Sequence, residues 1–335
     1  MNYIGSKQSL LPFLEKTILN VCGNDISEFV FCDLFAGTGT VGHYFKPKVK
    51  QVISNDLEFY SFVLNRNYIG NSRAIDSFKL LEQLRGVKGV EGVEGFIYQN
   101  YAEGGTANRL YFSAENGKKI DAIRQQIEAW KTSEKISDDV YFFLLASLLE
   151  SADKVANTAS VYGAYLKKLK TSAQKKMELK SAEFAETNQN NLVFQQDANQ
   201  LIKKISGDIL YLDPPYNARQ YGANYHLLNT IAHYKPFTPK GKTGLPDYNK
   251  SDYSSKPKVA EAFEELIKNA DFKYIFLSYN NEGLLPPEQL REILERYGSY
   301  DLATTKYNRF KADKTENRNH KANSVVEYLH VLEKA

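Results

Sequence analysis

The chain has 335 residues, of which 42% are hydrophobic and 25% are charged, and its net charge is +3. This composition is typical of a soluble globular protein. The length exceeds the roughly 250–300 residues at which a single core stops growing, so we expect two domains or one domain with a large insertion. There is no run of about 18 apolar residues and no amino-terminal signal pattern, which argues against a membrane protein and predicts a cytoplasmic location.

The cysteines and histidines show no metal-ligand pattern. Cys22 and Cys32 fit neither a zinc site nor a disulfide framework, and the five histidines do not form a ligand set. We therefore expect two buried apolar cysteines and no metal cofactor.

The amino-terminal region predicts a helix followed by a βαβ unit. Apolar residues recur at helical spacing in residues 8–22. Residues 29–35 form an apolar run broken by one acid, which is typical of a strand buried on both faces of a parallel sheet. Residues 49–54 predict a second strand, and residues 58–67 predict a helix after it.

A glycine motif follows the first predicted strand. Gly37, Gly39 and Gly42 match the spacing G-x-G-x-x-G, and Asp56 ends the second predicted strand nineteen residues after Gly37. Glycines let the backbone approach a ligand closely, and a carboxylate at that strand end can accept hydrogen bonds from two ribose hydroxyls. Nicotinamide dinucleotides and S-adenosylmethionine both contain an adenosine ribose, so the motif alone leaves both cofactors open.

The middle of the chain predicts a helical insertion. A glycine and valine repeat within residues 85–105 is typical of a surface loop. Residues 117–131 and 137–156 predict helices, and helical character should continue to about residue 186. We expect residues 1–80 and 191–335 to form the catalytic domain and residues 81–190 to form a mostly helical insertion.

The predicted sheet resumes after this insertion. Further strands are expected at residues 192–197, 209–212 and 274–279, and a candidate antiparallel pair at residues 300–307 and 325–332. Helices are predicted at residues 223–232, 261–269 and 287–297, and a long polar segment at residues 235–258. The fold class is therefore α/β, with a mostly parallel sheet, an antiparallel terminal pair and a mostly helical insertion.

The strand at residues 209–212 ends abruptly in Asp213, Pro214, Pro215 and Tyr216. Two consecutive prolines cannot continue a sheet ladder and hold the chain in an extended turn. A carboxylate, a carbonyl and an aromatic ring should therefore project from a rigid strand end, where we expect the chemistry to take place.

Three segments together resemble a known family. They are Tyr3-Ile4-Gly5-Ser6-Lys7, the stretch Asp-Leu-Phe-Ala-Gly-Thr-Gly-Thr at residues 33–40, and Asp-Pro-Pro-Tyr at residues 213–216. They resemble the S-adenosylmethionine-dependent DNA adenine N6-methyltransferases of the D12 class, which include the Dam methylases and many modification enzymes of restriction-modification systems. The resemblance covers most of the chain outside residues 81–190. It implies a Rossmann-like methyltransferase fold, with S-adenosylmethionine as cosubstrate.

The resemblance also implies which residues hold the cofactor. In the family an amino-terminal aromatic residue and a lysine contact the cofactor, and the glycine loop cradles it. The acid that ends the second strand holds the ribose, and an acid after the third strand lies near the adenine. These roles carry over onto Tyr3, Lys7, Phe35, Ala36, Gly37, Gly39, Asp56 and Asp197.

The chemistry of adenine methylation agrees with this assignment. The exocyclic amine of adenine is a poor nucleophile because its lone pair is delocalised into the ring. Asp213 and the Pro214 carbonyl can each accept one N6 hydrogen, which leaves the lone pair aimed at the methyl group, so positioning and electrostatic complementarity would supply most of the rate. Asp213 need not remove a proton before attack. With Pro215 completing the turn, Tyr216 would stack on a base flipped out of the duplex.

Double-stranded DNA is the expected partner. Tyr221 and Asn224 follow the catalytic motif and are candidates for contacts with the flipped base or its phosphate. We expect the helical insertion at residues 81–190 to read the target sequence. A cognate restriction endonuclease encoded nearby is a candidate second partner, and no membrane partner is expected.

Three lysine-rich segments could meet the phosphate backbone, at residues 167–180, 235–258 and 306–321. We favour the last of them, with Arg309 and Lys311, because it precedes the final predicted strand and should lie at a sheet edge near the catalytic turn.

Three other functions remain open at this point. An S-adenosylmethionine-dependent methyltransferase acting on RNA or on a protein amino group would keep the cofactor, but related enzymes more often carry Asn where Asp213 stands. A nicotinamide-dependent oxidoreductase would explain the glycine motif but not the residues from Asp213 to Tyr216. A catalytically idle DNA-binding protein could retain the fold, although the intact acid, prolines and tyrosine argue against it.

Overall fold

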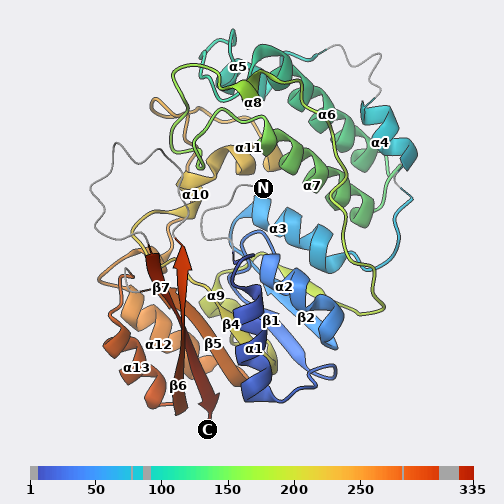
Figure 1. The fold of residues 1–335 in the computed structure, drawn as a ribbon. Coiled ribbons are helices and arrows are strands. Elements are labelled where there is room, and N and C mark those ends of the chain that lie inside the picture. Colours follow the sequence, from blue (N-terminus) through green and yellow to red (C-terminus); the bar gives the residue numbers. More distant parts are fainter. Residues whose placement is uncertain (1–6, 77, 86–91, 281–282, 309–323) are drawn as a thin grey trace. The chain divides into compact units, whose positions relative to one another are not determined.

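The chain forms two compact units in the computed structural model, which describes residues 7–76, 78–85, 92–280, 283–308 and 324–335 (Figure 1). The α/β unit consists of Gly5–Asn65, Thr187–Gln220 and Lys250–Ala335. The described part of the helical unit lies within Arg66–Glu186 and Tyr221–Asn249. Each unit is built from segments that are far apart in the sequence.

The α/β unit is organised around a seven-stranded sheet with the strand order β3-β2-β1-β4-β5-β7-β6. The strands are β1 (Val30–Asp33), β2 (Gln51–Asn55), β3 (Leu192–Phe194), β4 (Ser206–Leu212), β5 (Asp271–Asn280), β6 (Gly298–Asn308) and β7 (Ser324–Lys334). The first five strands are parallel to one another. β7 runs antiparallel to both β5 and β6. The predicted mostly parallel sheet with an antiparallel terminal pair is confirmed.

The direction of the connections reverses between β1 and β4. From β1 the chain proceeds to β2 and β3 on one side, and it then returns to place β4 on the other side of β1. In open parallel sheets, ligands bind outside the carboxyl ends of the strands at such a switch point. The glycine motif follows β1 and the Asp-Pro-Pro-Tyr motif follows β4, so both lie at this position.

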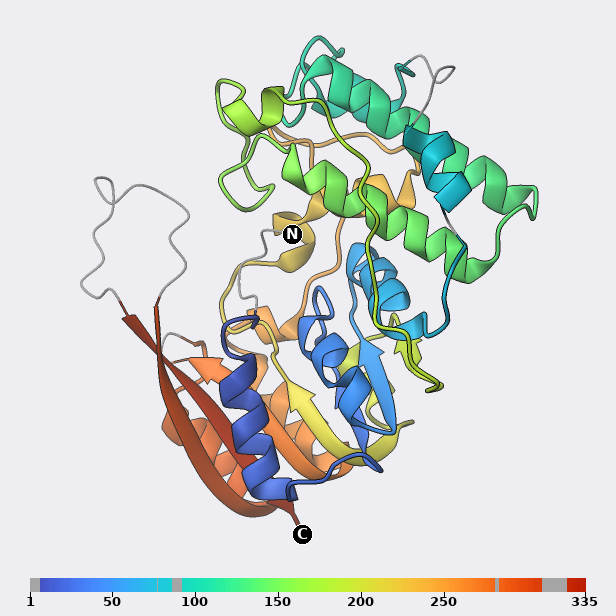
Figure 2. The ribbon, with the colours of Figure 1, turned by 45° about the vertical axis from the view of Figure 1, so that its right-hand side comes forward.

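Helices cover both faces of the sheet, as Figure 2 shows for α1 and α12. The helices of this unit are α1 (Leu11–Cys22), α2 (Thr40–Phe45), α3 (Phe59–Asn65), α9 (Ala198–Leu201), α12 (Val259–Asn269) and α13 (Pro287–Glu295). One face packs Cys32, Leu210 and Ile275 against α9, α12 and α13 in a single apolar core. On the other face, Phe31 stacks on Phe45 of α2 at a centroid distance of 4.6 Å.

The helical unit contains two long helices, α6 (Ala114–Thr132) and α7 (Asp138–Lys154), which pack together. Ser137 caps α7 by accepting a hydrogen bond from the Val140 amide. The shorter elements are a π-helical turn (Arg66–Gly70), α4 (Phe78–Arg85), α5 (Phe96–Tyr101), α8 (Thr171–Gln174), α10 (Tyr221–Asn224) and α11 (His226–His233). The Arg124 guanidinium donates to the last carbonyls of α11, including that of Ala232 at 3.0 Å, which satisfies groups that a helix end leaves unpaired.

The expected helix from residue 157 to about residue 186 is wrong. Only α8 forms there, and the chain beyond it runs extended over α6 and α7. Side chains of those helices accept its backbone amides: Asn116 accepts from Met177 at 2.8 Å, and Ser147 accepts from Ala182 at 3.0 Å. Tertiary hydrogen bonds thus replace the helical ones that composition suggested.

The expectation of a plain loop across residues 85–105 is also wrong in part. Residues 86–91, which carry much of the glycine repeat, lie outside the described residues. Beyond them α5 forms because the Asp121 carboxylate accepts the amides of Ile97 and Tyr98, at 2.9 and 2.7 Å. No helix in the described part of the chain is long and apolar enough to cross a membrane.

Candidate active site

The glycine turn after β1 depends on two left-handed residues. Gly37 and Gly39 have φ angles of 53° and 77°, which side-chain-bearing residues rarely adopt. The Asp56 carboxylate accepts the Gly37 amide at 2.8 Å and the Glu58 amide at 2.9 Å. Asp56 therefore holds the turn from the end of β2, where the sequence analysis expected a ribose ligand.

A second pair of buried side chains holds the same turn. The Asn65 amide group donates to the Gly37 carbonyl at 3.0 Å, and the Ser54 hydroxyl donates to the Asn65 carbonyl at 2.7 Å. Both side chains are fully buried. No sequence motif marks these two residues, since a lone Asn or Ser carries no signal before the helix and strand are placed side by side.

Asp33, at the end of β1, is a buried acid below the turn. Its side chain accepts the Gly42 amide at 2.9 Å, and the residue is 1% exposed. Burial raises the pKa of Asp33 to about 7, with smaller contributions from the negative charges of Asp213 and Asp56. Burial likewise raises the pKa of Asp56 to about 6.

Replacing Asp33 by asparagine should stabilise the protein at alkaline pH. Between pH 3.8, the ordinary pKa of an aspartate, and about pH 7, Asp33 keeps its proton in the native state but loses it in the unfolded chain. The protonated Asp33 therefore contributes its full stabilisation below pH 4, and this stabilisation is lost as the pH rises through 7. Asparagine keeps an oxygen for the Gly42 amide and carries no charge. We expect a gain of about 1–3 kcal/mol in the free energy of unfolding at pH 8, shrinking toward pH 4.

Urea denaturation of the Asp33→Asn variant and the wild type at pH 5 and pH 8 measures this difference. The Asp33→Ala variant serves as a control, because it removes both the charge and the acceptor. An equal gain at both pH values would contradict the prediction.

The turn after β4 places the Asp-Pro-Pro-Tyr residues at the switch point. The Asp213 side chain is 19% exposed, and Pro214 is buried. The Tyr216 ring packs edge-on against Tyr279 of β5 at a centroid distance of 6.2 Å. The Tyr216 carbonyl accepts the Leu284 amide at 2.9 Å, so the turn is fixed at both its beginning and its end.

Lys7 lies beside Asp213 in the structure. Its ammonium is 3.1 Å from Asp213 Oδ1 and 2.7 Å from Glu327 Oε1, and the Lys7 and Glu327 side chains are each 7% exposed. Burial would lower the pKa of Lys7, but the negative charges of Asp213 and Glu327 outweigh it and hold that pKa well above its ordinary value. Lys7 is therefore a cation that neutralises buried acids. Its contact with a cofactor stays a prediction.

Glu327 is a site residue that the sequence analysis missed. It belongs to β7, 320 residues from Lys7, and it lies opposite Asn280 at the carboxyl end of β5. The signal was an acid among the apolar residues at the start of this strand. Its meaning depends on the strand order, which the sequence does not display.

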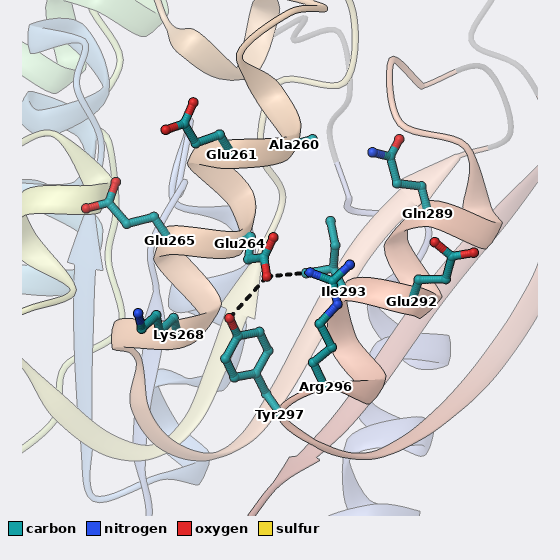
Figure 3. Close-up of a pocket in the computed structure, with 10 residues that line it drawn as sticks. All are labelled: Ala260, Glu261, Glu264, Glu265, Lys268, Gln289, Glu292, Ile293, Arg296 and Tyr297. Carbon is teal, nitrogen blue, oxygen red and sulfur yellow. Dashed lines mark hydrogen bonds and ion pairs between the residues drawn. The ribbon is translucent and has the colours of Figure 1, made fainter.

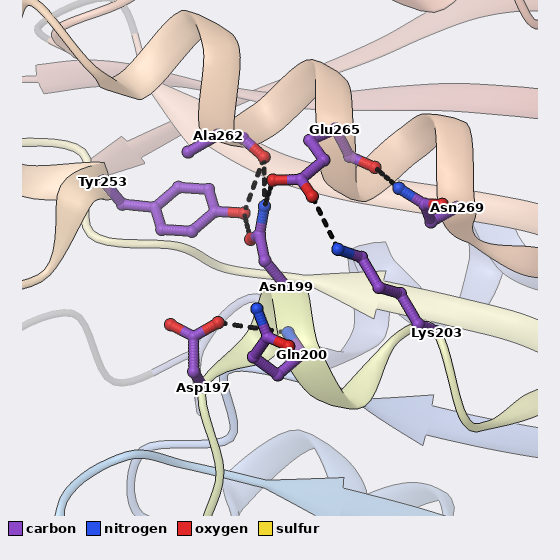
Figure 4. A network of polar contacts seen from close by, with 8 residues as sticks. All are labelled: Asp197, Asn199, Gln200, Lys203, Tyr253, Ala262, Glu265 and Asn269. Atoms are coloured by element: carbon purple, nitrogen blue, oxygen red, sulfur yellow. Dashed lines mark hydrogen bonds and ion pairs between the residues drawn. The ribbon is translucent and has the colours of Figure 1, made fainter.

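Phe35 is fixed by a residue from the polar segment at 235–258. The Tyr253 ring meets Phe35 edge-on at a centroid distance of 5.0 Å. The Tyr253 side chain is buried, and its hydroxyl donates to Asn199 Oδ1 at 2.6 Å (Figure 4). Asn199 in turn donates to the Ala262 carbonyl of α12 at 2.8 Å. This network ties the residue beside the glycine turn to α9 and α12.

Replacing Tyr253 by phenylalanine should lower the free energy of unfolding by about 1–3 kcal/mol. The ring contact with Phe35 would remain, but the buried Asn199 carbonyl oxygen would lose its 2.6 Å donor. Tyr248→Phe is the matched control, because Tyr248 is 36% exposed. Chemical denaturation of both variants tests the difference, and equal midpoints would contradict it.

Asp197 caps a helix. Its carboxylate accepts the Gln200 amide at 3.1 Å at the start of α9 (Figure 4). The residue is exposed, so the cap leaves the other carboxylate oxygen facing solvent. Contact with a cofactor adenine stays a prediction for Asp197.

The expected DNA contacts are distributed over both units. Tyr221 and Asn224 form the ends of α10 in the helical unit, where Tyr221 stacks on Tyr225 and the Asn224 carbonyl accepts the Tyr162 amide at 2.7 Å. In the α/β unit β6 ends at Asn308, paired with the first residue of β7 at the same sheet edge as Glu327. Tyr3, Arg309 and Lys311 lie outside the described residues.

A groove between α12 and α13 has a volume of about 510 Å³ (Figure 3). Two of its acids have partners: Glu264 accepts from Arg296 at 2.6 Å and from Tyr297 at 3.3 Å, and Glu265 accepts from Lys203 at 2.7 Å. It contains none of the predicted site residues. In the described part of the chain no His, Cys, Asp and Glu side chains gather in a group that could hold a metal ion.

The residues at the switch point fit an adenosyl cosubstrate with a reactive methyl group. Two left-handed glycines allow close approach of the backbone, Phe35 offers a partly buried ring, and Asp213 Oδ1 is buried and accepts no well-aligned hydrogen bond from the described residues. The strand order, the glycine turn after β1 and the Asp-Pro-Pro-Tyr turn after β4 together define a Rossmann-like methyltransferase.

The comparisons with known proteins give the family. The profile described as D12 class N6 adenine-specific DNA methyltransferase matches residues 3–293, and the chain therefore belongs to this family. The chain is 64% identical to the type II methyltransferase M.NlaIII of Neisseria lactamica, over 100% of this chain and 99% of that protein.

Two more distant relatives carry similar names. The type II methyltransferase M.CviAII of Paramecium bursaria Chlorella virus 1 is 39% identical, over 98% of this chain and 97% of its own length. The type II methyltransferase M.FokI of Planomicrobium okeanokoites is 38% identical over 100% of this chain. Only 53% of M.FokI is covered, so this chain spans about half the length of that relative.

Proposed function

We propose that this protein transfers a methyl group from S-adenosylmethionine to N6 of an adenine flipped out of a specific site in duplex DNA. The observation that carries the proposal is Asp213 Oδ1, a buried acceptor that the Lys7 ammonium approaches to 3.1 Å and that accepts no well-aligned hydrogen bond from the described residues. It follows β4 at the switch point, next to the glycine turn that follows β1. An amine that brings two N–H groups suits this acceptor and the neighbouring Pro214 carbonyl.

The bound cosubstrate supplies an electrophilic methyl group on a sulfonium. The chain's own residues would then orient the amine: Asp213 accepts one N6 hydrogen and the Pro214 carbonyl accepts the other, so the nitrogen lone pair is directed away from both. Methyl transfer would form the N6–CH₃ bond as the S–CH₃ bond breaks, which would leave positive charge on N6. The Asp213 carboxylate would stabilise that charge and accept the proton that N6 then releases.

The cofactor contacts belong to the proposal. Gly37, Gly39, Phe35 and Ala36 would cradle the adenosyl group, and Asp56 would hold the ribose while it anchors the Gly37 amide. Lys7, Tyr3 and Asp197 complete the proposed set. Pro215 would keep the turn rigid, and Tyr216 would stack on the flipped base.

Sequence reading is proposed for residues outside the reaction centre. Tyr221 and Asn224 in the helical unit, and Arg309 and Lys311 in the segment between β6 and β7, are the candidates for DNA contacts. Phosphate contacts by the basic residues would make the affinity fall steeply with salt. The type II names of the relatives support a role in restriction and modification, with a cognate endonuclease as a second gene product.

The test is transfer of label from S-[methyl-³H]adenosylmethionine to duplex DNA and, separately, to RNA, followed by analysis of the nucleosides. We expect label in DNA as N6-methyladenine and none in RNA. Label in RNA without label in DNA would overturn the proposal. Sequencing methylated adenines in a plasmid from a methylation-free host that expresses the protein would then give the target site.

A further inference from the structure

A buried ammonium shared by two carboxylates lies at the carboxyl edge of the sheet. Lys7 donates a hydrogen bond to Glu327 Oε1 at 2.7 Å. Its ammonium also forms an ion pair with Asp213 Oδ1 at 3.1 Å, which is longer and less well aligned. The lysine is thus bonded more closely to Glu327 than to Asp213, the acid that is proposed to perform the chemistry.

The antiparallel strand brings Glu327 to this edge. β7 runs against β5, so its beginning lies beside the carboxyl end of β5, with Glu327 opposite Asn280. β5 pairs in parallel with β4, up to Leu212 opposite Leu277. A parallel strand in the place of β7 would put its carboxyl end, not its beginning, at the reacting edge.

The charges in this group do not cancel. One ammonium faces two carboxylates, so the group carries one excess negative charge when all three are ionised. Without Glu327, the Lys7 ammonium would have Asp213 as its remaining acidic partner at hydrogen-bonding range, and it would compete with a substrate amine for Asp213 Oδ1. Charge-assisted hydrogen bonds of this kind are about twice as strong as neutral ones, so a substrate amine would compete poorly.

We propose that Glu327 is a positioning residue for methyl transfer: by accepting the short Lys7 hydrogen bond it draws the ammonium toward itself and weakens the hold of that ammonium on Asp213 Oδ1, so that this oxygen can accept the N6 hydrogen of the target amine. The inference rests on the proposed function of Asp213. Glu327 would contact neither the substrate nor the cosubstrate, and Lys7 would neutralise both buried acids while its shorter hydrogen bond is to Glu327.

The charged and titratable groups that act on Asp213 are Lys7, Glu327, Tyr211 and Asp33. Burial raises the pKa of Asp213 to about 6, Lys7 lowers it, and Glu327 raises it. Removing the Glu327 charge should therefore lower the pKa of Asp213. The acid limb of the pH profile of kcat should move to lower pH, even though the rate on the plateau falls.

The test compares Glu327→Gln with Glu333→Gln, a control on the same strand whose side chain is 53% exposed. For Glu327→Gln we expect kcat to fall about tenfold at pH 8, the effect of losing one properly placed hydrogen bond. A tenfold fall corresponds to about 1.4 kcal/mol in the activation free energy. The acid limb should move to lower pH, and the Kd for S-adenosylmethionine, measured by calorimetry, should change by less than about twofold. Glu333→Gln should match the wild type.

A wild-type kcat and pH profile in Glu327→Gln would overturn the inference, and so would a fall in kcat with an unmoved acid limb. If Glu327→Gln does not fold, the Glu327→Asp variant takes its place in the test. Its retained charge should keep the acid limb at the wild-type pH, while its shorter side chain should lower kcat. An unchanged kcat in Glu327→Asp would count against the inference. If the wild type itself transfers no methyl group to DNA, the proposed function fails instead, which distinguishes the two failures.

Discussion

Replacing Asp213 by alanine should lower the rate of methyl transfer by at least about a thousandfold, the magnitude seen when a preorganised group that stabilises transition-state charge is removed. The carboxylate is the buried acceptor that orients the amine and stabilises the positive charge that develops on nitrogen. Alanine would also leave the Lys7 ammonium with Glu327 as its acidic partner. Because Asp213 is not proposed to bind the cosubstrate, the Kd for S-adenosylmethionine should change by less than about threefold.

Single-turnover transfer to target DNA and calorimetric binding of S-adenosylmethionine measure the two quantities separately. Asp208→Asn is the matched control, because Asp208 lies on the same strand two residues after its beginning and binds the Val30 amide at 2.7 Å. Near-normal turnover in Asp213→Ala would show that the mechanism is wrong. An equal loss in Asp208→Asn would point to a general defect of β4.

The same residue sets the expected pH dependence. The ionised carboxylate is the acceptor, and burial raises the pKa of Asp213 to about 6. The rate should therefore be constant above pH 7 and should fall tenfold per unit as the pH drops below about 6. Asp213→Asn should remove this limb while retaining one carbonyl oxygen, with a rate between those of the wild type and Asp213→Ala.

The sheet could be predicted from the sequence to a large extent because its strands are short apolar runs that end at special residues. β1 ends in Asp33, β2 ends in Asn55 with Asp56 next to it, and Asp213 directly follows β4. That pattern places functional groups at strand ends. The antiparallel pair of β6 and β7 was expected at residues 300–307 and 325–332, and both strands form.

The extended segment at residues 175–182 could not be predicted in this way. Its backbone amides bond to Asn116, Ser147 and Ser151, residues of helices that precede it by tens of positions. Local composition favoured a helix, but three well-placed side-chain acceptors stabilise an extended chain instead. Tertiary hydrogen bonds of this kind leave no trace in local periodicity.

The same limit applies to the candidate site. Residues that lie within a short motif, such as Gly37, Asp56 and Asp213, were identifiable because each motif has a chemical reason for its spacing. Glu327, Asn65 and Tyr253 act through partners that only the fold brings near. Tyr253 in particular looked like part of a polar, lysine-rich segment, yet its ring is buried against Phe35.

Replacing Asp56 by alanine should weaken binding of S-adenosylmethionine about thirtyfold, which corresponds to the loss of about 2 kcal/mol in hydrogen bonds to a charged group. The side chain has two functions at once. It accepts the Gly37 and Glu58 amides, and it is proposed to accept hydrogen bonds from the ribose hydroxyls. At saturating cosubstrate kcat should stay within about threefold of the wild type, since Asp56 is not proposed to touch the reacting atoms.

Asp56→Asn separates those two functions. Asparagine keeps one oxygen for the Gly37 amide but offers the ribose a neutral group with two hydrogens. The free energy of unfolding of Asp56→Asn should therefore be higher than that of Asp56→Ala, while the affinity for S-adenosylmethionine should stay as low as in Asp56→Ala. Asp25→Ala is the control, because Asp25 also accepts a backbone amide, that of Ser27 at 2.9 Å, in an exposed turn. Calorimetry and urea denaturation of the three variants give both quantities. If Asp56→Asn bound S-adenosylmethionine as tightly as the wild type, Asp56 would be an anchor of the glycine turn alone, and the ribose would have to be held by another group at the switch point.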